Sequence, residues 1–517
     1  TTDDESAASG WTQATTGSSV AFTVDATGGA IYYSVGTSRQ TETDLKNAST
    51  VTIVSGTATF SEPQPYNIGV GDEVNYGEGA GTNVYISGRS SPTVYSVTTG
   101  TGAVPTNVTE PATVNSIKRA FGSLSAAETS SGDGSHLGTF DLTSGNGYQL
   151  NLVCYADGDG EMTDSPVEIL GWTTGPNNYI RIYTPTSTSE VGESQRHDGT
   201  WGTGFRLRPS SGTPIAVYED YVRIEGIAMQ AAASAACISV SGMSTNNDVR
   251  ISHCLMVGQG TGGSTRGLIA NDTELNLTVW NTIAYNNYGW QNFYVANCTT
   301  AYFYNCTAYN SSGGQGFRTL DTNPGTVTVK NCISMANNYD FYPSAEFDAS
   351  SDYNMSSDTT APGTNSLKSK IAANQFVSLT AGSEDLHLKT GSDAIDKVTT
   401  DPPTSFTNDI DGDTRPVGTY WDMGADEYIA RSLTLANHGS GQVGDKFTTT
   451  ESVTDVLFRF KLTRTGTVTV DELKVHFTYD DGVLNSDVSN GELWVDKNND
   501  GVIDSGDTMI EGSVTPE

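Results

Sequence analysis

One hydrophobic pattern recurs five times in the middle of the chain. Each copy has two apolar residues separated by a single residue, then one further residue, then Gly, His or Asn, and then Ile, Cys or Thr. The last position recurs at intervals of 24 to 28 residues between Ile227 and Cys332. Alternating apolar positions predict short β-strands with one buried face. The pattern therefore predicts a repeated unit of strand and corner with a nearly constant length.

A repeat of this length fits one coil of a right-handed parallel β-helix, in which each of three sides is a short strand. A leucine-rich horseshoe has a similar period, but its LxxLxLxxN pattern is missing, and a β-propeller blade is longer, at roughly 40–45 residues. We therefore expect two inward ladders of stacked side chains. The first contains Val222, Val249, Leu277, Ala301 and Val327, and the second contains Ile224, Ile251, Val279, Phe303 and Val329.

The residue after each strand predicts a sharp corner. Gly and Asn tolerate the left-handed backbone conformation that such a corner requires. Stacked Asn side chains can also hydrogen-bond to one another along the ladder. The corner positions are Gly226, His253, Asn281, Asn305 and Asn331, and the residues that return inward after them are Ile227, Cys254, Thr282, Cys306 and Cys332.

The strand patterns outside the repeat predict an all-β chain with four parts. Residues 1–30 form a polar tail that contains one alternating strand, and residues 31–112 form a small all-β domain. Residues 113–429 form the β-helix, with a capping helix at its start and a closing coil at its end. Residues 430–517 hold four strand-like runs, which predict a partial β-sandwich.

The capping helix is predicted from a short stretch with helical spacing. Ile117, Ala120, Phe121 and Leu124 recur at intervals that place them on one face of a helix. A helix at this point would cover the open end of the coil, which otherwise exposes unpaired strand edges.

Composition narrows the partners of the chain. Lys and Arg total 26 against 60 Asp and Glu, which gives a formal charge of −34. Such a surface repels phosphate backbones, so nucleic acid is a poor partner. No apolar run is long enough to span a bilayer. Only 17% of the residues are charged, and the excess of Thr, Ser, Asn and Gly suits short strands and tight turns.

Two stretches resemble known families. The succession Ser392–Asp396, Asp409–Gly418 and Asp422–Glu427 looks like the closing coil of exported right-handed parallel β-helix repeat proteins of bacteria. This resemblance implies the fold and export, but its members include lyases, hydrolases, adhesins and surface-layer proteins, so it does not choose a function. Residues 431–517 resemble part of an immunoglobulin-like sandwich of the kind that is appended to surface proteins.

One motif predicts a calcium site. An acidic loop places oxygen ligands at the spacing of a calcium loop, and Gly501 allows the tight turn that gathers them. An EF-hand would have Glu at the last position, where this chain has Asp507. The alternative is an acidic turn without metal. The predicted Ca²⁺ ligands are Asp496, Asn498, Asp500, Val502, Asp504 and Asp507.

Asp409, Asp411 and Asp413 form a second acidic cluster, with Arg415 beside it. The cluster suits either another calcium site or a set of catalytic carboxylates. In the alternative, structural interpretation, Arg415 pairs with Asp409 or Asp422 and closes the coil. We favour the structural interpretation because the cluster belongs to the closing signature.

The outward positions of the repeated strand carry no recognisable catalytic set. Pectate-lyase-like enzymes need a basic proton abstractor near calcium-binding acids, and polygalacturonase-like enzymes need three clustered aspartates, and neither set occurs. We therefore predict no catalytic residue, and an enzyme is less favoured than a non-enzyme. The same outward face carries aromatic side chains, at Trp280, Tyr302 and Tyr304. Exposed aromatic rings stack on sugars or contact proteins, unless a loop covers them.

These observations favour an extracellular or cell-surface structural or adhesive protein. In this hypothesis the strand with Val20, Phe22 and Val24 completes the sandwich of the next subunit by donor-strand complementation, which would build a head-to-tail filament. The expected partners are other copies of the chain and cell-surface or extracellular glycans. The alternatives are a polysaccharide-active β-helix enzyme, a lyase or hydrolase that uses Asp248 or Arg250, and a carbohydrate-binding protein without turnover.

Overall fold

The computed structural model describes residues 29–430, except 146, 260–262, 321, 323–324, 401–402 and 404–405. It also describes residues 432–437, 460–465, 491–495 and 508–514. Two compact units are present, one that ends at Tyr428 and one that begins at Ile429. No helix among the described residues is long and apolar enough to cross a membrane.

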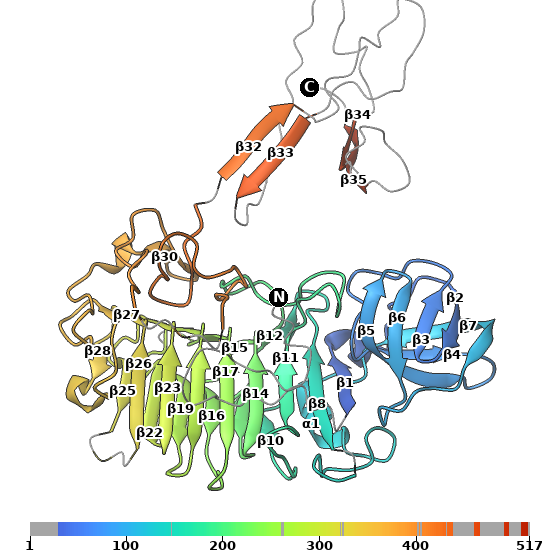
Figure 1. Cartoon of the computed structure of the whole chain (residues 1–517), viewed down its shortest axis with the longest axis horizontal. Coiled ribbons are helices and arrows are strands. Elements are labelled where there is room, and N and C mark those ends of the chain that lie inside the picture. Colours follow the sequence, from blue (N-terminus) through green and yellow to red (C-terminus); the bar gives the residue numbers. More distant parts are fainter. Residues whose placement is uncertain are drawn as a thin grey trace, which may run out of the picture. The chain divides into compact units, whose positions relative to one another are not determined.

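The centre of the first unit is a parallel β-helix built from three sheets, as the repeat predicted (Figure 1). The first sheet contains β1 (Gly29–Val35), β8 (Tyr148–Cys154), β11 (Ile180–Tyr183), β14 (Tyr221–Glu225), β17 (Asp248–Ser252), β20 (Asn276–Trp280), β23 (Thr300–Tyr304) and β26 (Thr326–Lys330). The second sheet contains β9 (Glu161–Met162), β12 (Arg206–Leu207), β15 (Ala228–Gln230), β18 (Leu255–Val257), β21 (Ile283–Tyr285), β24 (Thr307–Tyr309), β27 (Ile333–Met335) and β29 (Met355–Ser356). The third sheet contains β10 (Val167–Ile169), β13 (Ile215–Val217), β16 (Ala236–Val240), β19 (Arg266–Asn271), β22 (Phe293–Asn297), β25 (Gln315–Thr319) and β28 (Tyr339–Tyr342).

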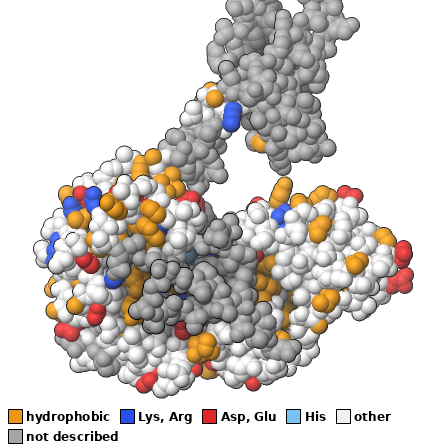
Figure 2. Space-filling model, viewed as in Figure 1, with side chains coloured by type: hydrophobic (Ala, Val, Ile, Leu, Met, Phe, Trp, Pro, Cys, Tyr) orange, Lys and Arg blue, Asp and Glu red, His pale blue; other side chains and the backbone are white. Residues whose placement is uncertain are grey.

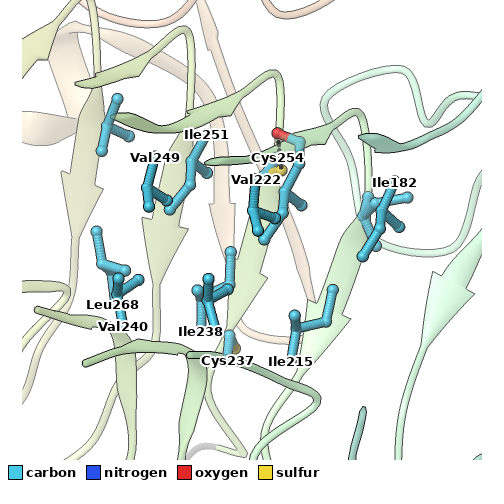
Figure 3. Packing of buried hydrophobic residues seen from close by; sticks show 14 of the residues in the cluster. Ile182, Ile215, Val222, Cys237, Ile238, Val240, Val249, Ile251, Cys254 and Leu268 are labelled. Carbon is cyan, nitrogen blue, oxygen red and sulfur yellow. Dashed lines mark hydrogen bonds between the residues drawn. The ribbon is translucent and has the colours of Figure 1, made fainter. Parts of the chain in front are cut away.

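The predicted register of the first sheet is confirmed. Val222 pairs with Val249, which pairs with Leu277, and the series continues through Ala301 to Val327. All members of both inward ladders are buried. In Figure 3 the side chains of Val222, Val249 and Ile251 point across the core toward the third sheet, where Ile215, Ile238 and Leu268 lie. The alternation of apolar and polar residues thus fixes which side of each rung faces inward.

The predicted corners are also confirmed. Gly226, His253, Asn281, Asn305 and Asn331 have φ angles between 46° and 69°, in the left-handed region. The amide of Asn331 donates to the side-chain oxygen of Asn305 at 3.2 Å, so part of the corner ladder is hydrogen-bonded. The six cysteines are free thiols, and all of them are buried.

The small N-terminal domain is a closed barrel that is inserted within the first coil. The barrel contains β2 (Thr50–Val54), β3 (Thr57–Phe60), β4 (Glu73–Tyr76), β5 (Thr82–Ser91), β6 (Val94–Thr98) and β7 (Val108–Lys118). β1, which precedes the barrel, pairs in parallel with β8 and belongs to the β-helix. The structure therefore draws the boundaries differently from the predicted ranges 31–112 and 113–429.

The helix at the start of the coil begins later than predicted. Ile117 lies in β7, and the helix α1 spans Leu124–Ser130. The Ser123 side chain accepts a hydrogen bond from the amide of Ala126, which caps the first turn of the helix. Leu124 and Ala127 are buried in the β-helix core, so the helix does pack against the first coil.

The closing segment, residues 376–427, does not form the end of the stack. It contains the hairpin β30 (Phe376–Thr380) and β31 (Ser383–Leu388) and then runs without further strands. Its apolar residues pack on the outer face of the second sheet, where Leu388 and Met423 share a cluster with Leu255 and Ile283. The predicted closing coil is thus a lateral cover, because the outer face of the second sheet is itself apolar.

Three short 3-10 helices and two antiparallel strand pairs complete the described structure. The 3-10 helices span Thr37–Thr41, Ser344–Glu346 and Ala372–Asn374. In the second unit β32 (Ser432–Asn437) pairs with β33 (Phe460–Thr465), and β34 (Gly491–Val495) pairs with β35 (Thr508–Val514), both antiparallel.

The surface view shows sparse charged side chains on the β-helix and exposed hydrophobic residues around the closing segment (Figure 2), where Ile371 and Val377 are exposed.

Candidate ligand-binding face

Two of the predicted sites lie outside the described residues. The calcium-loop residues Asp496, Asn498, Asp500, Val502, Asp504 and Asp507 are among these, and so is the donor strand with Val20, Phe22 and Val24. Both sites stay predictions.

The predicted aromatic patch on the first sheet is partly covered. The ring of Trp280 stacks on Phe406 of the closing segment, with centroids 5.9 Å apart and an interplanar angle of 19°. Tyr302 and Tyr304 stack on each other at 6.0 Å and 4°. All three predicted residues are only half-buried, but Trp280 already has an aromatic partner from the chain itself. The structure therefore splits the patch between a packed Trp and a tyrosine pair.

The charged positions on the same sheet pair with one another. Asp248 lies 2.8 Å from the guanidinium of Arg223 and 2.7 Å from that of Arg250. Arg181 pairs in the same way with Glu225. Because these charges are satisfied within the protein, the first sheet offers little unbalanced charge to a ligand.

The second acidic cluster is divided between two roles. Asp409 is buried, and its carboxylate accepts the amides of Asp411 and Asp413 at 3.0 and 2.8 Å. The side chain of Asp411 turns instead toward His387, at 3.1 Å. The predicted partner of Arg415 was wrong, because its guanidinium lies 3.0 Å from the carboxylate of Glu427.

A different set of residues meets on the outer face of the third sheet. Neighbouring rungs there bring outward residues into two columns, since Tyr294 pairs with Arg318 and Arg318 pairs with Tyr342, while Gln315 pairs with Tyr339. We call this surface the arginine–aromatic face. It consists of Arg266, Trp290, Gln291, Tyr294, Gln315, Arg318, Tyr339 and Tyr342.

The core positions of the same strands hold these rungs in register. Phe293 and Phe317 stack inside the coil with centroids 4.8 Å apart, and Phe317 and Phe341 stack at 5.2 Å. Each Phe lies one position before the outward residue of its strand, so an inward phenylalanine ladder aligns the outward column. The interval of 24 residues between these phenylalanines is a sequence signal for this face.

The two arginines of the face lie on aromatic rings. The guanidinium of Arg266 lies 3.8 Å from the ring centre of Trp290 and 5.4 Å from that of Tyr294. The guanidinium of Arg318 lies 5.2 Å from the centre of the same Tyr294 ring. Such cation–π contacts contribute about 0.5–2 kcal/mol and hold a guanidinium flat against the ring.

Glutamine amides fix the same guanidinium groups. The Nε of Arg266 donates to the Oε1 of Gln291 at 2.9 Å, and the Nε2 of Gln291 donates to the Oε1 of Gln315 at 2.7 Å. Arg318 donates to the same Gln315 oxygen at 3.3 Å. The chain of amides thus links the two arginines into one preorganised group.

Neither arginine has a carboxylate partner among the residues that the structure describes. Burial is the main cause that lowers the pKa of Arg266, and the positive charge of Arg318 lowers it further. Each remains half-buried with Tyr339 and Tyr342 exposed beside them, at 44% and 39%. In a chain with 60 acidic and 26 basic residues, two neighbouring cations that have no carboxylate partner among the described residues form a candidate site for an anionic ligand.

The fold defines a parallel β-helix protein, and the arginine–aromatic face is its candidate ligand-binding surface. No family model and no curated protein matches the chain. Among solved structures, the chain is similar to the crystal structure of pectate lyase Pel9A. The match has 13% sequence identity and a TM-score of 0.26, and it covers 60% of this chain and 91% of that chain. At this level of similarity the likeness assigns no activity to the chain.

Proposed function

We propose that this chain is an extracellular adhesive protein that binds an anionic polysaccharide on its arginine–aromatic face. The observation that carries the proposal is the pair Arg266 and Arg318, which are held on aromatic rings and lack a carboxylate partner among the described residues. Guanidinium groups bind carboxylates through paired hydrogen bonds, and aromatic rings stack on sugar rings. Uronate polymers present both features.

The dimensions of the face support an extended ligand. Neighbouring rungs of a parallel sheet lie about 4.8 Å apart, so four rungs from Arg266 to Tyr342 span about 14 Å. Donors and rings repeat along this distance in two columns. A linear chain of sugars can contact successive rungs in turn, whereas a compact ligand would use only one or two of them.

The chemistry of the face favours binding over turnover. Its eight residues offer hydrogen bonds, charge and stacking surfaces, and they include no carboxylate and no histidine, the side chains that most often act as general acid or base near neutral pH. A binding face without such groups suits an adhesin on a cell surface.

Calorimetric titration of the full chain with polygalacturonate, and with a neutral glucan of similar length, tests the proposal. We expect binding to the uronate polymer and weaker binding to the glucan. Arg266→Ala and Arg318→Ala should each weaken uronate binding about tenfold to a hundredfold, since a charge-assisted hydrogen bond contributes about 1.5–3 kcal/mol. Raised salt should weaken the wild-type interaction because the face is solvent-accessible.

Arg208→Ala serves as the matched control. Arg208 is also a surface arginine, but it lies off the face and has a carboxylate, Glu161, at 3.6 Å. Its replacement should leave uronate binding unchanged. Equal losses in the three variants, or no uronate binding by the wild type, would contradict the proposal. Release of unsaturated or reducing oligosaccharides during the titration would favour the alternative of a polysaccharide-active enzyme.

A further inference from the structure

Three potential metal ligands converge beside the second sheet, in the closing segment. His387 lies at the end of β31, Asp411 follows 24 residues later, and Asp426 lies near the end of the segment. One ligand atom from each lies within 4.8 Å of the others. The side chains of His387 and Asp411 are only 5% and 11% exposed, and Asp426 is buried. The cluster combines an imidazole nitrogen with carboxylate oxygens.

The imidazole is oriented as a metal ligand requires. Its Nδ1 lies 2.5 Å from a carboxylate oxygen of Asp385, while its Nε2 faces Asp411 at 3.1 Å. Histidines that bind metals commonly place the second ring nitrogen against a carboxylate, which fixes the ring and makes it a stronger ligand. Asp385 supplies that outer contact here and leaves Nε2 for the centre.

Negative charge exceeds positive charge around the centre. Among the described residues of the closing segment, the buried carboxylates are Glu384, Asp409, Asp422, Asp426 and Glu427, and the buried bases are His387 and Arg415. Arg415 is committed to Glu427 at 3.0 Å. A divalent cation would offset this excess of buried negative charge.

The neighbouring backbone leaves room over the same atoms. Gly199 approaches the cluster so closely that an added Cβ would lie 2.6 Å from the Nε2 of His387 and 3.2 Å from an oxygen of Asp411. Any side chain at this position would therefore occupy the space next to the ligand atoms. The glycine keeps that space free of a side chain.

We infer that His387, Asp411 and Asp426 bind a divalent transition-metal ion, with Zn²⁺ as the best fit. A mixed set of one imidazole and two carboxylates suits zinc, whereas Ca²⁺ prefers six to eight oxygen ligands. The ion would join β31 to the end of the closing segment and so hold the lateral cover on the second sheet. This site is separate from the predicted calcium loop and from the arginine–aromatic face.

Zinc binding to the full chain, measured by equilibrium dialysis with excess calcium present, tests the inference. We expect the wild type to bind one more equivalent of Zn²⁺ than His387→Gln and Asp426→Asn do. Asp413→Asn, which changes an acidic residue of the same loop outside the ligand set, should retain the full wild-type stoichiometry. Equal stoichiometry in all four proteins would overturn the inference and leave His387 as an imidazolium paired with Asp385 and Asp411.

A second measurement does not depend on how the variants fold. Zinc that binds only the folded chain raises the midpoint of thermal unfolding with concentration. For the wild type, in excess calcium, we expect a rise of several degrees with Zn²⁺ and none with added Mg²⁺. A wild-type midpoint that does not change with Zn²⁺ would also overturn the inference.

Discussion

The guanidinium of Arg119 lies 2.8 Å from a carboxylate oxygen of Asp157. Arg119 follows the last strand of the barrel and Asp157 follows β8, so this ion pair joins the inserted barrel to the β-helix. The same guanidinium reaches Asp72 at 2.8 Å and stacks on Tyr155 at 3.7 Å. The Arg119 side chain is fully buried, and its two carboxylate partners keep it satisfied.

Replacing Arg119 by Met should destabilise the junction strongly. Removing one partner of a buried ion pair costs about 3–5 kcal/mol because the remaining charge stays buried without compensation. Arg208→Met removes an exposed arginine and should cost less than about 1 kcal/mol. Chemical denaturation of the two variants gives the comparison. Similar midpoints for both variants would show that the Arg119 pair contributes no more than a surface pair.

The buried imidazole of His197 should make stability depend on pH. Burial, helped by the positive charge of Arg196, lowers the pKa of His197 to about 4, below the ordinary value of about 6.5 in an unfolded chain. The unfolded chain therefore binds a proton in this window that the folded chain does not. The contribution of neutral His197 to the free energy of unfolding is therefore complete above about pH 6.5 and is lost as the pH falls toward 4.

The variant His197→Asn isolates this effect. Its amide oxygen can replace Nδ1 as the acceptor for the amide of Gly199, but the side chain does not titrate. Between neutral pH and about pH 4 the wild type should lose about 3 kcal/mol more of its unfolding free energy than the variant does. Parallel stability curves for the two proteins would contradict the prediction.

Substitutions at Asn305 should change the stability of the protein in two ways, through its side-chain hydrogen bonds and through its left-handed backbone conformation. Its φ of 48° is unfavourable for a residue with a Cβ, and its amide donates to the carbonyl groups of Asp422 and Gly424 at 3.1 and 3.2 Å. Asn305→Gly should lose the buried hydrogen bonds, at about 1–3 kcal/mol. Asn305→Ala should cost about 1 kcal/mol more because alanine resists the left-handed conformation. Denaturation midpoints in the reverse order would contradict this assignment.

The calcium loop of the sequence leads to a test on the full chain. We expect Ca²⁺ to raise the unfolding midpoint of the C-terminal unit and EGTA to lower it. Asp500→Ala, which removes a predicted ligand, should abolish the response, whereas Asp413→Ala should leave it intact. An unchanged response in Asp500→Ala would place any calcium site elsewhere.

The donor-strand hypothesis makes a separate prediction. Negative-stain electron microscopy of the full chain should show filaments that shorten or disappear when EGTA is added. Deletion of residues 1–28 should abolish the filaments while the circular dichroism spectrum of the β-structure is kept, because the deletion stops before β1, the first strand of the β-helix. Filaments that persist after the deletion would exclude donor-strand complementation through Val20, Phe22 and Val24.

The sequence by itself determined how the coils of the β-helix stack. The inward ladders of Val222 and Ile224 and the corners at Asn281 and Asn305 could be predicted because each depends on a local pattern that recurs once per coil. Side-chain alternation decides the inward face, and the left-handed corner restricts the residue type, so both leave a signal within a few residues.

Only the tertiary structure decided where the remaining pieces meet. Arg266 and Arg318 lie two coils apart, and their contacts through Tyr294 depend on the register of the third sheet, which the first-sheet repeat does not specify. His387 meets Asp426 across an irregular segment with no period. β1 reaches β8 across the whole inserted barrel. Contacts between distant residues depend on how the chain folds back on itself, and a local pattern of apolar residues carries no record of that path.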